Sequence, residues 1–161
     1  MSVFNHIGLV VRNLERSQRF YEEVLGFTAW YGDAIPDQAT TKLLVLEPPL
    51  DVHVVYLTLD GFVLELLHYG APGALPPLDA SPSRTMAETG LSHLSVSVAD
   101  IRATAQLAIE HGGEIVEESD VGVALLVRDP DGQLIELLTA DYPARRTQLP
   151  RPTTHPNEGN D

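Results

Sequence analysis

The chain has 161 residues, 43% of them hydrophobic and 20% charged, which suits one compact domain or two small modules that share a core. Its formal net charge of −13 disfavours binding to nucleic acid or to an anionic membrane, and no apolar stretch is long enough to span a bilayer. The absence of cysteine excludes disulfides and thiolate metal sites, and with no signal peptide evident we expect a cytoplasmic protein.

The N-terminal half, residues 1–69, predicts a strand, a helix and three further strands. Residues 6–11 alternate as a strand requires, Asn13 is suited to cap the helix that follows, and Gly26 is suited to end it. Residues 36–47 are an insertion that only this half has, and a short helix is one interpretation of it. The remaining strands are expected at about residues 27–32, 51–59 and 62–68.

The C-terminal half, residues 91–140, predicts the same order of elements after a proline-rich connector over residues 70–90. Asp100 is the expected helix cap, and Gly112 with Gly113 is the expected stop. Residues 141–161 are rich in proline and poor in apolar residues, which predicts a largely disordered tail. The later strands are expected at about residues 114–118, 121–128 and 133–139.

Two pairs of segments repeat along the chain. DGFVLELL at 60–67 resembles DGQLIELL at 131–138, and FNHIGLVVRNLERSQRFYEEVLGF at 4–27 resembles LSHLSVSVADIRATAQLAIEHGGE at 91–114. Each half therefore supplies one histidine early and one glutamate late, which are His6 and Glu65 in the first half and His93 and Glu136 in the second. Such internal repetition indicates two similar structural modules.

These four residues form a candidate metal site if the halves pack with approximate twofold symmetry. Two imidazoles and two carboxylates suit one divalent ion such as Zn²⁺, Ni²⁺, Co²⁺, Mn²⁺ or Fe²⁺, and the ion would offset the cost of burying the carboxylates. Taken singly, each histidine is more often a strand residue without a ligand role, and each glutamate can face solvent. The sequence leaves open whether the two pairs meet within one chain or across two subunits.

Residues 4–140 resemble the vicinal oxygen chelate superfamily, which includes glyoxalase I, methylmalonyl-CoA epimerase, extradiol dioxygenases and proteins of bleomycin or fosfomycin resistance. The motifs that carry the resemblance are NHIGLVVRNLERSQRFYEEVLGF, LELLHY, LSHLSVSVADI and DPDGQLIELL. The resemblance implies an α+β fold of two tandem βαβββ modules that form a cupped, incomplete β-barrel around one divalent metal. It also implies a homodimer, and it places the metal ligands at His6, Glu65, His93 and Glu136, a set most similar to bacterial-type glyoxalase I.

The reaction class that this site favours is isomerisation or epimerisation alpha to a carbonyl, through a metal-stabilised enediolate or enolate. The substrate is expected to be a small-molecule carbonyl compound or thioester. Glu65 and Glu136 are both candidates for the catalytic base, with a slight preference for Glu136. Arginines that would hold a glutathione or coenzyme A thioester are scarce, and Arg12, Arg84 and Arg128 are not assigned to that role.

Three other functions occur on this fold. An extradiol-type Fe²⁺ dioxygenase needs two histidines and one carboxylate, so a second glutamate argues against it. A metal-free drug-binding module would not need the four ligands, and thiol-transferring resistance enzymes typically carry His where Glu65 stands. Outside the candidate site, His68 is predicted on the strand face opposite Glu65, and residues 129–132 are predicted to form a hairpin turn.

Overall fold

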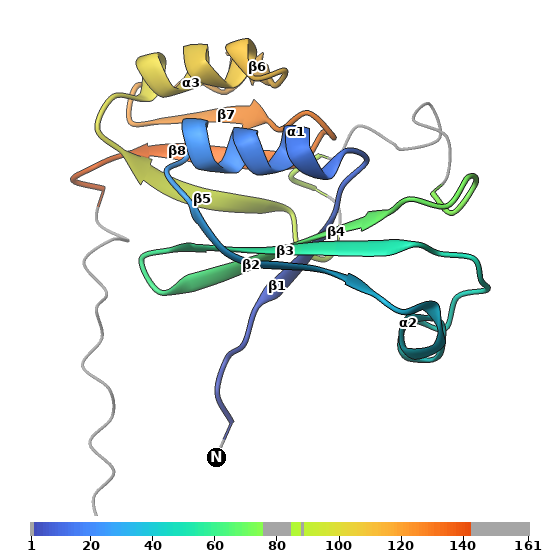
Figure 1. Ribbon diagram of the computed structural model, residues 1–161. Helices are drawn as coiled ribbons and strands as arrows, with labels where there is room; N and C mark the ends of the chain where they lie inside the picture. The colour runs from blue at the N-terminus through green and yellow to red at the C-terminus, as the bar shows by residue number, and fades with distance from the viewer. Residues whose placement is uncertain (1, 76–84, 88, 143–161) are drawn as a thin grey trace, which may run out of the picture.

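Each half of the chain forms one four-stranded sheet in the computed structural model, which describes residues 2–75, 85–87 and 89–142 (Figure 1). The first half contains, in chain order, β1 (Ile7–Val10), α1 (Leu14–Arg19), the π-helical turn η1 (Phe20–Val24), β2 (Thr28–Ile35), α2 (Asp37–Leu44), β3 (Val52–Leu59) and β4 (Phe62–Tyr69). The second contains β5 (His93–Val98), α3 (Ile101–Glu110), β6 (Glu114–Val116), the 3-10 turn η3 (Glu117–Ser119), β7 (Ala124–Arg128) and β8 (Leu134–Thr139). The predicted α+β fold class is confirmed, and the two sheets do not close into a barrel.

The helices begin and end where the sequence predicted, for local reasons. Asn13 accepts a hydrogen bond from the backbone N–H of Arg16 at 2.9 Å, and Asp100 accepts one from the N–H of Ala103 at 2.9 Å. Each bond satisfies a donor that the first helical turn leaves without a partner. The stop at Gly26 depends on a φ of 79°, a left-handed conformation that glycine adopts without steric cost.

The two sheets have the same topology, in the orders β1-β4-β3-β2 and β5-β8-β7-β6. In each sheet the first strand runs parallel to the last strand of its half. The register places Gly8 opposite Glu65 in the first sheet and Ser95 opposite Glu136 in the second. The two glutamates therefore occupy equivalent places in the two sheets, as the sequence repeat predicted.

One hydrophobic core lies between the two halves. It contains apolar residues from the helices and from one face of each sheet, including Phe20, Leu66, Ala105 and Leu137, all fully buried. Figure 1 shows α1 over one face of the first sheet, beside the strands of the second sheet. Because side chains alternate along a strand, the residues between these core positions point to the opposite face of each sheet.

A polar joint between the halves fixes this arrangement. The Asp131 carboxylate accepts hydrogen bonds from the backbone N–H of Arg12 at 3.1 Å, the Arg16 guanidinium at 2.7 Å and the Ser17 hydroxyl at 3.2 Å. The buried Asp129 accepts one from the Tyr21 hydroxyl at 3.0 Å. Burial is the main cause that raises the pKa of Asp129, and burial together with this carboxylate raises the pKa of Tyr21 well above 10. The predicted hairpin turn thus also holds the helix of the first half.

Several local features differ from the sequence prediction or refine it. α2 occupies the insertion, β2 extends to Ile35, and the strand predicted over residues 114–118 gives way to η3 after Val116. Among the described residues, no helix is long and apolar enough to cross a bilayer. About half of the connector, residues 76–84 and 88, and nearly all of the predicted disordered tail, residues 143–161, lie outside the described residues.

Candidate metal centre

The first histidine–glutamate pair lies on the face of the β1–β4 sheet that points away from the core. His6 precedes β1 and Glu65 lies at the centre of the neighbouring strand β4, with 3.2 Å between His6 Nε2 and Glu65 Oε2. The Glu65 side chain is buried, and Gly8 lies directly beside it. A Cβ at Gly8 would lie 3.4 Å from Glu65 Oε2, so the absence of a side chain there keeps the space beside the carboxylate open.

The hydrogen bonding of His6 leaves its Nε2 atom suited to bind a cation. His6 Nδ1 lies 2.6 Å from the side-chain oxygen of Asn5, which can only accept, so Nδ1 carries a proton. In the neutral ring Nε2 then presents a lone pair to the Glu65 carboxylate, and two acceptors 3.2 Å apart repel each other unless a positive charge joins them. Either a protonated imidazole or a bound cation satisfies this geometry.

The second pair repeats the arrangement on the outward face of the other sheet. His93 Nε2 lies 3.7 Å from Glu136 Oε2, and His93 Nδ1 forms a hydrogen bond of 2.8 Å with the hydroxyl of Ser92. Ser92 is the repeat equivalent of Asn5, so both rings are held through Nδ1 and direct Nε2 towards a glutamate. Ser95 donates a hydrogen bond of 2.8 Å to Glu136 Oε2.

The two glutamates differ in how tightly they are held. Glu65 Oε1 accepts a short hydrogen bond from the Tyr56 hydroxyl on β3, and the Glu65 side chain is 11% exposed. This hydrogen bond is the main cause that raises the pKa of Tyr56 to about 12. The Glu136 side chain is 28% exposed, and its bonded partner is the exposed Ser95. Glu65 is therefore the anchored carboxylate and Glu136 the freer one.

The structure brings each pair together but does not bring the two pairs together within one chain. Both pairs lie on sheet faces that point away from the shared core. No group of three or more His, Asp or Glu side chains among the described residues is placed to hold one metal ion. The four predicted ligands thus form two half-sites, each on an open sheet face.

Each half-site fits part of a metal coordination sphere. Ligand atoms about 2.0–2.2 Å from one cation lie about 3 Å apart at right angles and about 3.5 Å apart in a tetrahedron. The two nitrogen–oxygen distances, 3.2 and 3.7 Å, fall close to these separations. The donor set of imidazole nitrogen and carboxylate oxygen suits borderline divalent ions, but two ligands alone do not make a closed site.

The other histidines with described contacts do not join these half-sites. His68 lies on the core side of β4, as predicted, with Nδ1 3.1 Å from the backbone oxygen of Val11. His53, paired opposite His68 on β3, lies 3.1 Å from an Asp51 oxygen. His111 is the C-cap residue of α3 and lies 3.2 Å from the Glu23 carboxylate, so its contacts are structural.

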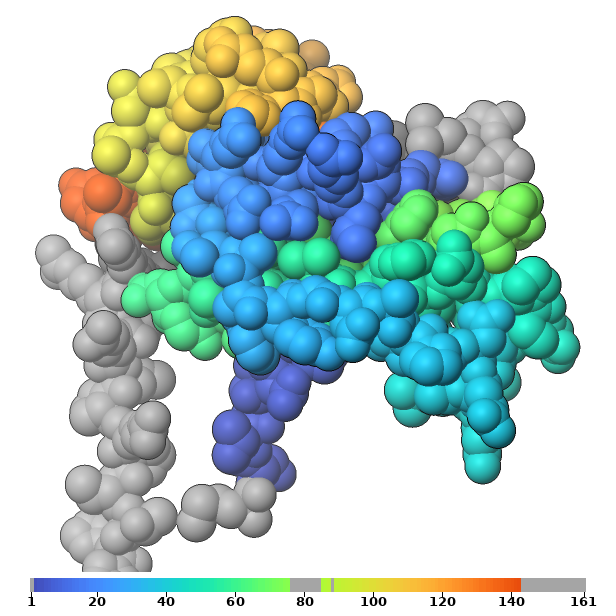
Figure 2. All heavy atoms as spheres, viewed as in Figure 1, coloured from blue at the N-terminus to red at the C-terminus, as the bar shows by residue number. Residues whose placement is uncertain are grey.

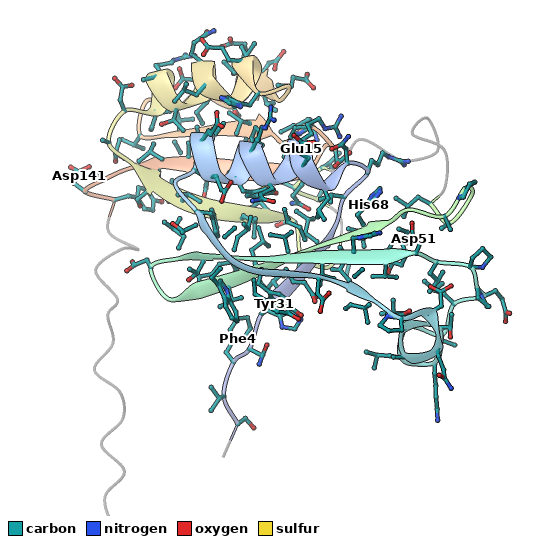
Figure 3. The ribbon with its side chains drawn as sticks, viewed as in Figure 1. Phe4, Glu15, Tyr31, Asp51, His68 and Asp141 are labelled. Atoms are coloured by element: carbon teal, nitrogen blue, oxygen red, sulfur yellow. The ribbon has the colours of Figure 1, made fainter. Side chains whose placement is uncertain are left out.

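Three aromatic side chains extend the first half-site across its sheet, and the sequence pattern did not predict that they would lie together. We call these side chains the ring platform: Trp30, Tyr31 and Tyr56, whose ring centroids lie 5.9–6.0 Å from one another. The His6 ring meets the Tyr56 ring edge-on, with 5.6 Å between centroids. Figure 3 shows Tyr31 on the face of the sheet opposite α1. The single tryptophan of the chain was the signal that could have drawn attention to this face.

A β-bulge builds the ring platform. Ala29 pairs with Leu57 and Tyr31 pairs with Tyr56, so the extra residue Trp30 interrupts the regular register. In a regular strand Tyr31 would point to the same face as Ala29, which packs on the core. The bulge turns Tyr31 outward beside Trp30, and nothing in the local sequence pattern announces that shift.

Comparison with known proteins places the chain in a family. Residues 3–137 match the family model described as the Glyoxalase/Bleomycin resistance protein/Dioxygenase superfamily. A probable lactoylglutathione lyase of Arabidopsis thaliana, named as chloroplastic, is 27% identical over 139 residues, which are 83% of this chain and 34% of the plant protein. The chain thus spans about a third of the length of that curated relative.

Solved structures with the same fold include three informative examples. A glyoxalase family protein of Bacillus cereus superposes with a TM-score of 0.68 at 18% identity, covering 84% of this chain and 92% of the other. The trypanothione-dependent glyoxalase I of Leishmania major gives 0.57 at 25% identity, covering 83% and 84%. A variant of the Listeria monocytogenes fosfomycin resistance protein, solved with Mn(II) and 1S,2S-dihydroxypropylphosphonic acid, gives 0.59 at 17% identity, covering 90% and 98%.

The match over most of the chain and the duplicated half-site architecture agree on the class of protein. The chain belongs to the Glyoxalase/Bleomycin resistance protein/Dioxygenase superfamily, as its sequence motifs predicted.

Proposed function

We propose that the protein is a homodimeric, divalent-metal-dependent enzyme in which each active site is shared between two subunits. His6 and Glu65 of one subunit and His93 and Glu136 of the other would complete one coordination sphere. The observation that carries the proposal is the presence of two half-sites on outward sheet faces, each with Nε2 directed at a carboxylate. A second copy is the partner that supplies the missing half to both.

The proposed reaction is isomerisation or epimerisation at the carbon alpha to a carbonyl group in a small-molecule substrate. When bound, the divalent cation would act as a Lewis acid that polarises the carbonyl and favours loss of the alpha proton. The Glu136 carboxylate would accept this proton and return it to the adjacent carbon or to the other face. Glu136 is preferred over Glu65 as the base because it is more exposed and its bonded partner is the exposed Ser95.

Glu65 and Tyr56 would have a positioning role. The Tyr56 hydroxyl holds Glu65 Oε1, which leaves Oε2 directed at His6 and fixes the carboxylate in one orientation. A buried and hydrogen-bonded carboxylate loses little conformational entropy when it binds a cation. The first half would therefore supply a rigid half of the site, and the second half would supply the group that moves a proton.

Mixed dimers test the shared site directly. A His6→Ala chain lacks a first half-site, and a His93→Ala chain lacks a second one, so each homodimer contains only incomplete sites. When the two variants are co-expressed and the heterodimer is isolated by two affinity tags, one of its two sites contains all four natural ligands. We expect that heterodimer to bind one Zn²⁺ per dimer at the wild-type affinity, measured by elemental analysis and competition with a chromogenic chelator.

The matched control pairs a His6→Ala/His93→Ala double variant with a wild-type chain, because both sites of that heterodimer contain one defective half. We expect it to bind zinc more weakly than the complementing heterodimer. A monomeric wild-type protein, or equal zinc binding by the two heterodimers, would contradict the shared site.

A further inference from the structure

The ring platform is unusually exposed for large aromatic side chains. Trp30 is 63% exposed and Tyr31 is 48% exposed, although the same sheet buries most of its apolar residues. Figure 2 shows the strands of the first sheet, with β2 in front, open to solvent in this view below α1. Leaving an indole and a phenol ring in water forgoes free energy of burial, so such a group of exposed rings indicates a binding surface.

The ring platform is continuous with the first half-site. Tyr56 belongs to the ring platform and also contacts both residues of the first half-site. Its ring meets His6 edge-on, and its hydroxyl donates a hydrogen bond to Glu65. Trp30 and Tyr31 continue the same face onto the edge strand β2. A molecule bound between His6 and Glu65 would therefore extend over these rings.

The charges around the platform disfavour an anionic ligand. The described strands β1 to β4 contain no lysine or arginine, and Glu65 and Asp33 are carboxylates on the platform side of the sheet. In the second sheet Arg128 is the one cation in a described strand, and its guanidinium donates a hydrogen bond of 3.3 Å to the Gly132 carbonyl. The carboxylates of glutathione or the phosphates of coenzyme A would meet few positive charges here, so the cost of removing them from water would not be offset.

We infer that the ring platform binds an aromatic ring and that the substrate is an uncharged aromatic carbonyl compound. The inference rests on the proposed function, because the His6–Glu65 pair and its metal set the position of the carbonyl group. Aromatic rings attract one another in offset or edge-to-face geometry, and the open faces of Trp30 and Tyr31 offer both. The reacting carbonyl would lie near His6, and the aryl group would lie over Trp30 and Tyr31.

Fluorescence of the single tryptophan tests the inference without measuring turnover. Excitation at 295 nm reports Trp30 alone, so binding of a ring beside it changes the emission. We expect 2-hydroxyacetophenone to change the emission of the full-length dimer saturably, and Tyr31→Ala to weaken its binding about 3- to 10-fold, the size expected for one aromatic contact. Trp30→Ala, followed by calorimetry, should weaken binding to a similar extent.

Three comparisons make the result specific. Leu43→Ala removes an apolar side chain that is 80% exposed on α2, outside the platform, and should leave the affinity unchanged. S-benzylglutathione contains an aromatic ring together with carboxylates and should bind at least 10-fold more weakly than 2-hydroxyacetophenone. Loading with Zn²⁺ should strengthen binding of 2-hydroxyacetophenone and leave binding of toluene unchanged, because toluene has no carbonyl oxygen.

The outcomes separate this inference from the proposed function. If the wild-type protein binds zinc through both half-sites, but Tyr31→Ala and Trp30→Ala bind 2-hydroxyacetophenone like the wild type, the ring site is wrong and the proposed function stands. Tighter binding of S-benzylglutathione or of benzyltrimethylammonium would contradict an uncharged ligand. If the mixed dimers bind zinc equally, the proposed function fails, whatever the ring platform binds.

Discussion

The two halves of the molecule have the same topology and the same histidine–glutamate pair, yet they surround that pair differently. In the first half the carboxylate of Glu65 is buried, held by the Tyr56 phenol and bordered by aromatic rings. In the second half Glu136 is more exposed and receives its hydrogen bond from the exposed Ser95. The two halves thus share the histidine–glutamate pair, whereas the neighbouring positions differ.

Because of this difference, we expect the two halves to have different roles in the proposed site. A buried carboxylate with a fixed phenol partner is suited to hold a ligand in one orientation. A more exposed carboxylate beside a small hydroxyl can change its partner, as a group that accepts and returns a proton must do. Changes to the two carboxylates, to the proposed metal and to the joint on the core side should therefore have different effects.

The largest effect is expected from neutralising the proposed base. Glu136→Gln keeps the size of the side chain but removes its ability to accept a proton, so kcat should fall about 10²- to 10⁴-fold, the usual contribution of general acid–base catalysis. Glu65→Gln should weaken zinc binding more than Glu136→Gln does, because the Glu65 carboxylate is buried and held by the Tyr56 hydroxyl. Steady-state kinetics and zinc competition measure the two effects separately.

The control for this comparison is Glu118→Gln, an exposed carboxylate in η3. It should leave both kcat and zinc affinity unchanged. Equal kcat values for Glu136→Gln and the wild-type protein would remove Glu136 from the mechanism, and the asymmetry between the halves would need another explanation.

Metal removal should destabilise the two halves together, because the proposed ion joins a first half to the second half of a partner. At a free metal concentration 100 times the Kd, binding to the native state alone contributes about 2.7 kcal/mol of stability. Dialysis against a chelator should therefore lower Tm and weaken the dimer, and added Zn²⁺ should restore both. Calorimetry with sedimentation measures this, and a chelator that changes neither quantity argues against a metal at the subunit contact.

The joint on the core side should lose part of its contribution to stability at alkaline pH. The pKa of Tyr21 is raised in the folded protein, so its contribution to stability is complete below pH 10 and is lost as the pH rises through the folded value. Tyr21→Phe removes the hydrogen bond to the buried Asp129 and should cost about 1–3 kcal/mol at neutral pH. The variant should also lose less stability than the wild-type protein above pH 10.

Urea denaturation at several pH values between 7 and 11 measures this difference. Tyr142→Phe, at the end of the described chain, is the matched control and should follow the wild-type curve. If Tyr21→Phe loses stability above pH 10 as steeply as the wild-type protein does, ionisation of Tyr21 is not the cause of the alkaline loss.

The smallest effect is expected at Ser95, which contacts Glu136 from the exposed face of β5. Ser95→Ala removes one hydrogen bond to a partly exposed carboxylate, so zinc affinity should fall by no more than about 10-fold, or ~1.4 kcal/mol. Tyr56→Phe, the corresponding change in the first half, should weaken zinc binding more because Glu65 is buried. Ser97→Ala, on the same strand, is the control, and the reverse order of the two effects would overturn the assignment of Glu65 as the anchored ligand.

The sequence by itself determined the modules and their histidine–glutamate pairs. Period-two alternation around residues 6–11, the helix caps Asn13 and Asp100, and the stop at Gly26 are local signals, and each appears in the structure as predicted. The internal repeat aligned His6 with His93 and Glu65 with Glu136, and strand pairing within each half then brought each histidine close to its glutamate. Local hydrogen bonding and burial of alternate side chains are sufficient to specify these features.

Only the tertiary structure decided how the halves face each other and what surrounds the first pair. The sequence left open whether all four predicted ligands meet in one chain, because either face of each module could pack against the other module. The shared core and the contacts of Asp129 and Asp131 settle that choice by joining the helix sides, which leaves both pairs on outward faces. The ring platform depends on the bulge at Trp30, a shift of register that strand pairing imposes and that no local pattern encodes.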